Sequence, residues 1–379
     1  MAGEPSGDAL AAELVVALRQ LEPALSFFGA TGPELERAGV ERIVDTRELS
    51  VMGLFEVVGR LPAAWRALGR LEEVAVDRGA AGAVLVDSPD FNLRLAGRLA
   101  GRGIPVVQYV SPTVWAWRPK RVRVLERAVR RLLLTLPFEP AFYEGTGVDA
   151  VYVGNPAVDR LPKRPASRAK VAERLGLPPR APWVAIVPGS REGELVRVAP
   201  ALAAAAARVA AAVPEAVFLA PVAPGLEPTE VAAALAGGPP VRLVEERRLE
   251  ALGHAAAALA TSGTASLELA LLGVPHVVAY RASRATYAAA RLLVATDWIA
   301  LPNLIAGGAV VPEFVQRLDP EVLAAPVITW LGDRAARAEV VEGLAGVRAA
   351  LGPPGVAGRA AAATLEALGV SPAVPGGPV

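Results

Sequence analysis

The chain has 379 residues, of which 53% are hydrophobic and 20% charged, so it is predicted to be a globular protein of two or three domains, and general disorder is excluded. A net charge of +1 gives no overall attraction to nucleic acid, so any anion recognition has to be local. The absence of cysteine excludes disulfides and thiolate metal sites, and two histidines leave little for imidazole ligation or for Ser-His catalysis.

The chain opens on a glycine-containing turn before its first predicted helix. Ser6, Gly7 and Asp8 precede the helical pattern of residues 9–20. Such a turn normally follows a buried strand, yet only two residues come before Gly3. We therefore expect either a missing first strand or a terminal turn, in which the three residues serve a ligand or simply cap the helix.

The next helical pattern, over residues 62–78, combines apolar bulk with arginines. Phe55 and Trp65 belong to an apolar stripe, and Arg66 and Arg70 lie beside it. This arrangement is typical of a membrane-surface helix and also of a core helix with a solvated edge.

Two predicted strands follow, and both end in polar or aromatic loops. Residues 82–86 form a short apolar run that ends at Asp87, where ligands of open α/β sheets collect. Asp90 directly precedes a helix and fits its cap, which leaves Asp87 available as a general base. The strand at 105–110 ends in a loop with Trp115, Trp117 and Arg118, which is either an aromatic surface for stacking and acyl chains or a packed loop.

Residues 118–131 are predicted to form a strongly basic amphipathic helix. Its charged side fits solvent, anionic lipid or nucleic acid, and the nearly neutral chain makes nucleic acid the weakest of the three. No apolar run reaches the ~18 to 20 residues that span a bilayer, so we expect a cytoplasmic protein or one attached to a membrane surface.

A polar, proline-containing stretch at 159–168 is predicted to link two halves, and the second half again alternates strands with helices. Its strand at 183–187 runs into a turn with Gly189, Ser190 and Arg191 before a helix. Helix-start amides and a guanidinium together favour a phosphate at this turn.

A second strand, turn and helix unit covers residues 255–278. Gly263, Thr264 and Ala265 lie where its helix begins, so unpaired amides favour an anion there. Glu268 follows one turn later, and a buried lone carboxylate needs a partner. We therefore expect Glu268 to face a polar ligand such as a sugar hydroxyl, or to lie at the rim of an ordinary capped helix.

These segments together resemble the lipid-A-disaccharide synthases, a family of glycosyltransferases of the GT-B type. The resemblance rests on AGEPSGD, DSPDFN, YVSPTVWAWRPKRV, LPFEPAFY, PGSR, TSGTASLE and TDWIALPNLIAG, which occur in this order over nearly the whole chain. It implies an α/β fold of two Rossmann-like parallel-sheet domains that face a cleft. The implied domains are an acceptor domain at 1–158, a UDP-sugar domain at 159–339, helices that pack back on the first domain at 340–368, and a disordered tail at 369–379.

The resemblance also implies a reaction and its site. UDP-2,3-diacylglucosamine would donate its sugar to 2,3-diacylglucosamine 1-phosphate, with inversion and without a metal or cofactor. Asp87 would be the base, and Arg191 would stabilise the leaving diphosphate. The implied UDP-binding residues are Gly189, Ser190, Gly263, Thr264, Ala265, Glu268 on the ribose, and, from the LPNLIAG segment and a helix after it, Asn303 and Gln316.

Lipid substrates favour an acyl-chain or membrane role for the aromatic and basic segments. Ser6, Gly7, Asp8, Phe55, Trp115, Trp117 and Arg118 would serve the acceptor and its lipid chains, and the enzyme would attach to the anionic inner face of the cell membrane. The family usually has histidine where this chain has Asn155. Two other classes stay open: a UDP-sugar epimerase of the same fold and a non-catalytic sugar-nucleotide-binding protein.

Overall fold

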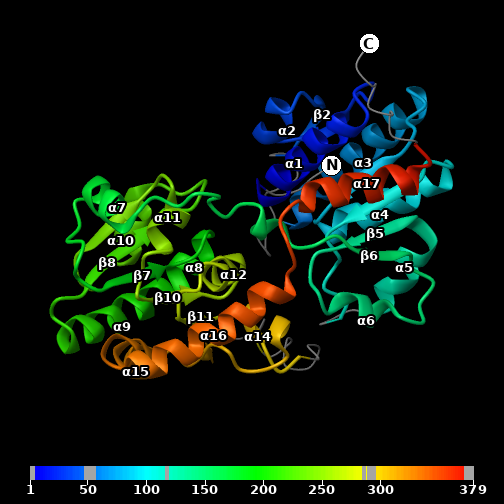
Figure 1. The fold of residues 1–379 in the computed structure, drawn as a ribbon. Helices are drawn as coiled ribbons and strands as arrows, with labels where there is room; N and C mark the ends of the chain where they lie inside the picture. Colours follow the sequence, from blue (N-terminus) through cyan, green and yellow to red (C-terminus); the bar gives the residue numbers. More distant parts are fainter. Residues whose placement is uncertain (1–4, 47–56, 116–118, 284–286, 288–295, 371–379) are drawn as a thin grey trace, which may run out of the picture. The chain divides into compact units, whose positions relative to one another are not determined.

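The structure, a computed structural model, describes residues 5–46, 57–115, 119–283, 287 and 296–370 (Figure 1). The chain divides into two compact units. Residues 1–159 and 353–379 form the first unit, and residues 160–352 form the second. Several predictions concern residues outside the described ones. They are those for Phe55, Trp117 and Arg118, for the residues before the first helix, and for the last nine residues of the expected tail.

The first unit contains a four-stranded parallel sheet in the order β3-β4-β5-β6 and a separate parallel pair, β1-β2. Its strands are β1 (Phe28–Thr31), β2 (Glu41–Asp45), β3 (Ala83–Val86), β4 (Val106–Tyr109), β5 (Arg131–Leu134) and β6 (Ala150–Tyr152).

Helices cover both faces of this sheet. On one face α1 packs beside the C-terminal helix α17, and on the other face lie α3, α4 and α5 (Figure 1). The helical segments are α1 (Pro5–Leu21), α2 (Pro33–Arg37), α3 (Val57–Asp77), α4 (Pro89–Gly101), η2 (Pro119–Arg121), α5 (Val122–Ala128), α6 (Glu139–Tyr143), η3 (Pro156–Val158) and α17 (Val356–Leu368).

The second unit contains a six-stranded parallel sheet in the order β12-β11-β10-β7-β8-β9. Successive residues of its central strand point to opposite faces, so that Val184 and Ile186 enter one core and Trp183 and Ala185 enter the other. The strands are β7 (Trp183–Val187), β8 (Val217–Pro221), β9 (Val241–Val244), β10 (Ala257–Thr261), β11 (His276–Tyr280) and β12 (Glu313–Val315).

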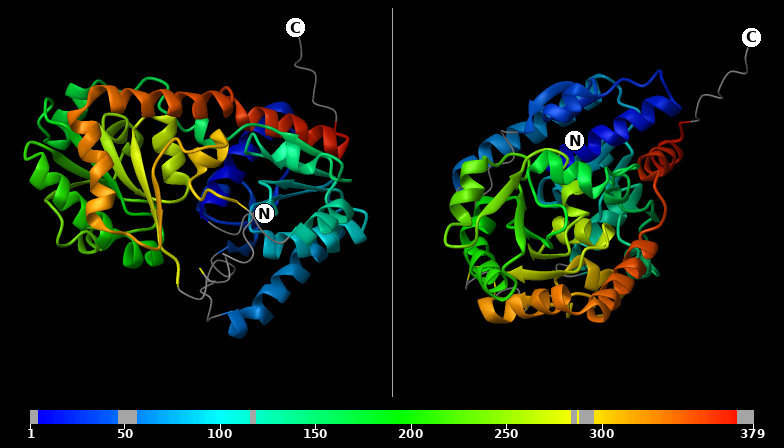
Figure 2. Two further views of the ribbon diagram at one scale, coloured as in Figure 1. Left: turned by 90° about the horizontal axis from the view of Figure 1, so that it is seen from below. Right: turned by 60° about the vertical axis from the view of Figure 1, so that its left-hand side comes forward.

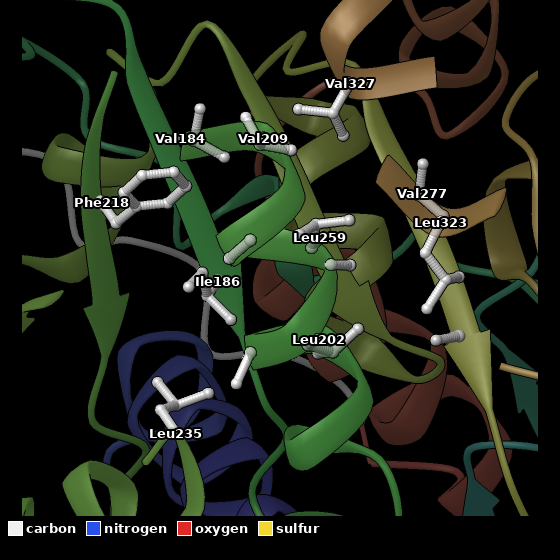
Figure 3. Packing of buried hydrophobic residues seen from close by; sticks show 14 of the residues in the cluster. Val184, Ile186, Leu202, Val209, Phe218, Leu235, Leu259, Val277, Leu323 and Val327 are labelled. Carbon is white, nitrogen blue, oxygen red and sulfur yellow. The ribbon is translucent and has the colours of Figure 1, made fainter. Parts of the chain in front are cut away.

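The sheet of the second unit is also covered on both faces. The core shown in Figure 3 joins the sheet to α9, α10 and α15, with Leu202, Leu235 and Leu323 pointing inward, and α9 and α15 lie side by side (Figure 2). Helices α7, α11 and α12 cover the other face. The helices are α7 (Arg168–Leu175), α8 (Glu192–Arg197), α9 (Ala199–Ala212), α10 (Pro228–Ala234), α11 (Arg248–Leu252), α12 (Thr264–Leu271), α14 (Leu301–Ala306), α15 (Pro320–Gly332) and α16 (Arg334–Ala350).

Three expectations about helices are corrected. The first helix begins at Pro5, so Ser6, Gly7 and Asp8 lie in its first turn rather than in a loop before it. The basic segment is helical only as η2 and α5, because Arg131 already begins β5. Helix α16 packs on α12, α14 and α15 of the second unit, so α17 is the segment that returns to the first.

None of the helices within the described ranges is long and apolar enough to cross a membrane.

Candidate active site

The two turns that the sequence singled out lie next to each other in the second unit. Strands β7 and β10 are parallel neighbours, with Val187 paired to Ala260 at their carboxyl ends. The Thr261 hydroxyl donates a hydrogen bond of 2.9 Å to the carbonyl of Pro188, which joins the two turns directly. One edge of the sheet therefore carries both predicted anion-binding turns.

The turn after β7 is closed by a carboxylate of its own helix. Glu194 accepts hydrogen bonds from the backbone N–H groups of Ser190, at 2.8 Å, and Arg191, at 3.3 Å. Gly189 has a φ of 113°, and a Cβ there would lie 2.3 Å from the Glu194 carboxylate, so only glycine fits. Two amides expected to hold phosphate are thus occupied by Glu194, and Arg191 remains as the exposed cationic group of this turn.

The turn after β10 is open by comparison. Gly263 and Thr264 are exposed at the start of α12, and no side chain among the described residues caps this helix. The Ser266 hydroxyl instead donates to the Gly263 carbonyl at 2.8 Å, and Ala265 is half-buried behind the turn. The first amides and the positive end of the α12 dipole therefore face the surface, where they favour an anion.

Glu268 has the partner that a buried carboxylate requires. Its side chain is 7% exposed and forms a two-pronged ion pair with Arg248, with N–O distances of 2.5 and 3.0 Å. Arg248 follows β9 at the same carboxyl edge and, with Glu245 and Leu249, lines an open hollow of about 350 Å³. Arg248 was not among the predicted site residues. Its place shortly after the predicted strand at 241–244 could have indicated it, because ligands bind at the carboxyl ends of parallel strands.

Asn303 and Gln316 take places different from those expected. The buried Asn303 amide donates to Val311 O and to Glu313, and its oxygen accepts from the amides of Val310 and Val311. This uses the full hydrogen-bonding capacity of the side chain, so Asn303 holds its own loop and has no group left for UDP. Gln316 is half-buried and follows strand β12 directly, at the same edge, rather than lying in a helix.

In the first unit, Asp87 lies half-buried at the carboxyl end of β3 and has a φ of 51°. Its backbone is fixed to the neighbouring strand, because its N–H donates to Tyr109 O at 3.0 Å. The expected capping role of Asp90 is not found. Ser88 is the N-terminal cap residue of α4, and Asp90 pairs with Arg121 instead.

Asp8 caps a helix, which was one of the two roles expected for it, but this helix is α2 and not the one to which Asp8 belongs. Its buried carboxylate accepts hydrogen bonds of 2.8 Å from the N–H groups of Gly32 and Glu34, and thereby caps helix α2. A Cβ on Gly32 would lie 2.6 Å from that carboxylate, so this close approach requires glycine. Gly7 is buried, and Ser6 is the exposed member of the motif.

A buried carboxyl group, Glu139, gathers the loops at the ends of β4 and β5. It is 2% exposed and accepts hydrogen bonds from the backbone amides of Thr135 and Leu136, at 3.2 and 3.0 Å, and from the Trp115 indole, at 3.3 Å. Asn155 donates to Thr135 O at 3.1 Å. The half-buried Trp115 is therefore held by the chain itself, and no sequence pattern had indicated a role for Glu139.

Burial raises the pKa of Glu139 to about 7, against the opposing effect of its hydrogen bonds from Leu136, Thr135 and Trp115. An unfolded glutamate loses its proton near 4.5, so between pH 4.5 and 7 the folded state holds a proton that the unfolded state has released. The free energy of unfolding contributed by this group therefore falls as pH rises through that range. We expect Glu139→Gln to be more stable than the unmodified chain at pH 8 by roughly 2 to 3 kcal/mol, and about equal to it at pH 4.5.

Urea unfolding of both proteins at several pH values between 4.5 and 8 measures this difference. Tyr143→Phe is the matched control, because it removes the 2.7 Å hydrogen bond to Ser111 in the same cluster and leaves Glu139 in place. Burial raises the pKa of Tyr143 to about 12, so its effect on stability should stay constant over this range. A Glu139→Gln difference that does not change with pH would show that the carboxyl group titrates normally.

The two helix-covered parallel sheets, with a ligand edge at the carboxyl ends of the strands, define a chain of the GT-B class. Solved structures agree with this fold. The S. aureus MnaA–UDP co-structure has a TM-score of 0.65 at 13% identity, over 100% of this chain and 97% of that one. A glycotransferase of kitacinnamycin has a TM-score of 0.59 at 18% identity, over 96% and 97% of the two chains.

The family follows from the sequence. The model of the family described as lipid-A-disaccharide synthetase matches residues 1–331. The lipid-A-disaccharide synthase of Anaeromyxobacter dehalogenans is 47% identical over 98% of this chain and 96% of its own length, and that of Myxococcus xanthus is 46% identical over 97% and 96%. The chain belongs to the lipid-A-disaccharide synthetase family, which confirms the predicted family, its GT-B fold and its glycosyltransferase class.

The epimerase alternative is not favoured by these comparisons. A putative UDP-N-acetylglucosamine 2-epimerase from Listeria monocytogenes shares the fold, with a TM-score of 0.61 over 97% of this chain and 94% of that one, but only 15% of its sequence is identical. A likeness at that level shows the fold alone.

Proposed function

We propose that the chain transfers the acylated glucosamine of UDP-2,3-diacylglucosamine to 2,3-diacylglucosamine 1-phosphate and releases UDP. The observation that carries this proposal is the hydrogen bond from Thr261 to Pro188, which places the uncapped start of α12 next to the turn of Arg191 in a chain of this family. An exposed helix start and a guanidinium on one edge are suited to a diphosphate.

The donor half of the site would act by electrostatics. Negative charge grows on the diphosphate as its bond to the anomeric carbon breaks, and the α12 amides and Arg191 would stabilise that charge. Because Glu194 occupies the amides of Ser190 and Arg191, α12 would supply most of the backbone contacts. Glu268, oriented by Arg248, would accept a hydrogen bond from a ribose hydroxyl.

The acceptor half would supply the base. Asp87 would take the proton from the 6-hydroxyl of the acceptor while that oxygen bonds to the anomeric carbon of the donor. The bond from this carbon to the diphosphate breaks in the same displacement, so the configuration inverts and UDP carries away the electron pair. An ionised carboxylate within hydrogen-bonding reach of the hydroxyl is what this step needs.

Incubation of the purified protein with both lipids tests the proposal. We expect the tetraacyl disaccharide phosphate, and UDP only when the acceptor lipid is present. UDP-sugar conversion without the acceptor would indicate an epimerase. UDP binding with no turnover would indicate a sugar-nucleotide-binding protein, and either result would overturn the proposal.

We further propose that the first unit attaches to anionic membrane surfaces through α3 and α4. Trp65 is 48% exposed, and the guanidinium groups of Arg94 and Arg98 lie 5.7 and 5.3 Å from its ring centre. An exposed tryptophan among cations is typical of surfaces that bind lipid headgroups.

Sedimentation with vesicles that contain anionic lipid measures this attachment. We expect binding that weakens with added salt and falls several-fold in Trp65→Ala and in Arg94→Gln. Arg348→Gln is the control, because it removes the same charge from an exposed position of α16 in the second unit. Binding that ignores both salt and lipid charge would contradict the proposal.

A further inference from the structure

Left-handed backbone conformations gather at the carboxyl ends of β3 and β4. Among the described residues, five residues other than glycine have a positive φ, and three of them are Asp87 at 51°, Ser88 at 43° and Val110 at 71°. Side chains with a Cβ are strained in this region, and a β-branched valine is strained most. Such strain persists only where the surrounding structure holds it, and it is concentrated at functional sites.

Two buried amide side chains hold two of these residues, Asp87 and Val110. Asn92, from α4, donates hydrogen bonds to the carbonyls of Val86, at 3.0 Å, and Asp87, at 2.7 Å. Gln108, from β4, donates to the carbonyls of Asp87, at 3.3 Å, and Val110, at 3.2 Å. The carbonyl oxygen of Asp87 thus accepts hydrogen bonds from both side chains, although one comes from α4 and the other from β4.

This arrangement leaves polar atoms unsatisfied. Asn92 and Gln108 are both 0% exposed, and within the described part of the chain neither Asn92 Oδ1 nor Gln108 Oε1 has a hydrogen-bond partner. A buried acceptor without a donor is unfavourable, and stability alone would select apolar side chains at such positions. The hydrogen bonds that these amides donate to the backbone therefore have to offset the cost of the two unsatisfied oxygens.

We propose that Asn92 and Gln108 are positioning residues that hold the Asp87 backbone in its left-handed conformation and so aim its carboxylate at the acceptor hydroxyl. The inference rests on the proposed function, because it assigns these residues to the base of that reaction. The alternative is that the amides only satisfy the carbonyls of two strand ends, in which case their loss would lower stability and leave turnover per folded molecule unchanged.

Rescue by glycine separates the two cases. Asn92→Ala should lower kcat about tenfold and leave the KM for the UDP-sugar unchanged, because that substrate binds to the second unit. Glycine adopts the left-handed conformation without strain. Adding Ser88→Gly to Asn92→Ala should therefore recover a few-fold of the lost kcat. A kcat that Asn92→Ala leaves unchanged, or that Ser88→Gly does not recover, would overturn the inference.

A second measurement does not depend on activity. Ser88→Gly alone should raise the unfolding midpoint, because glycine relieves the strain of a positive φ. At an unstrained position glycine usually lowers the midpoint, so a lowered midpoint would overturn the claim of strain. Thr364→Val is the control, because it removes one hydrogen bond from a residue equally buried in α17, and its kcat should match that of the unmodified chain. If the unmodified chain forms no disaccharide, the proposed function fails, whereas the unfolding result still decides whether the turn is strained.

Discussion

Asp87→Asn is expected to lower kcat by ~10²- to 10⁴-fold, because an amide keeps the shape of the carboxylate and cannot take up the acceptor proton. The side chain lies half-buried at the carboxyl end of β3, where ligands of parallel sheets bind. Initial rates of disaccharide formation measure the effect. The KM for the donor should change little, since UDP is assigned to the other unit.

Asp90→Asn provides the matched control for this change. Asp90 belongs to the same motif, and its side chain is 64% exposed and paired with Arg121. Loss of a surface ion pair has little effect, so kcat should stay within about twofold of the unmodified chain. Equal rates for Asp87→Asn and Asp90→Asn would remove Asp87 as the base.

Arg191→Ala is expected to lose roughly 2 to 4 kcal/mol of transition-state stabilisation, or about 30- to 1000-fold in kcat/KM. The loss is expected because the turn of Arg191 is joined through Pro188 to the turn that precedes α12, where we propose that the diphosphate binds. Arg191→Lys should give an intermediate rate, because an ammonium keeps the charge and loses the two-pronged geometry. Steady-state kinetics and UDP titration measure the two effects.

Arg197→Ala tests whether any cation of helix α8 would serve. Arg197 is exposed in the last turn of the same helix. Each variant removes one positive charge, so net charge changes equally in the two. The Arg197 guanidinium reaches back to Gly193 in the first turn of α8, so the comparison tests whether a second cation close to the turn serves as well as Arg191. An Arg197→Ala rate as low as that of Arg191→Ala would indicate a general effect of charge on substrate binding.

Sequence patterns predicted the second unit well because its signals are local. The strand at Trp183–Val187 was predicted with its observed bounds, and both turns follow strands as expected. Short runs of buried residues bounded by glycine are sufficient for this, since strand, turn and helix start all lie within a few residues.

Side-chain partners could not be predicted in the same way. Arg248 and Glu268 are 20 residues apart, and Asp8 caps a helix whose N-terminal cap residue, Gly32, lies 24 residues later. Only the tertiary fold brings such groups together, so the sequence left a ligand and a structural role open for both carboxylates and did not predict their partners within the chain. The partners of Asn303 were not predicted either, because they belong to its own loop and to β12.

The junction between the two units has a consequence for dissecting the protein. Asp159 is the last residue of the first unit before the chain enters the second unit, and the chain re-enters the first unit at Pro353. The Asp159 carboxylate accepts hydrogen bonds of 2.6 and 2.8 Å from the N–H groups of Gly355 and Val356. Residues 160–352 are thus an insertion whose two ends leave the host fold at one point. A short linker from Asp159 to the segment before Gly355 would therefore connect two points that already lie in contact, and would make the first unit one uninterrupted polypeptide.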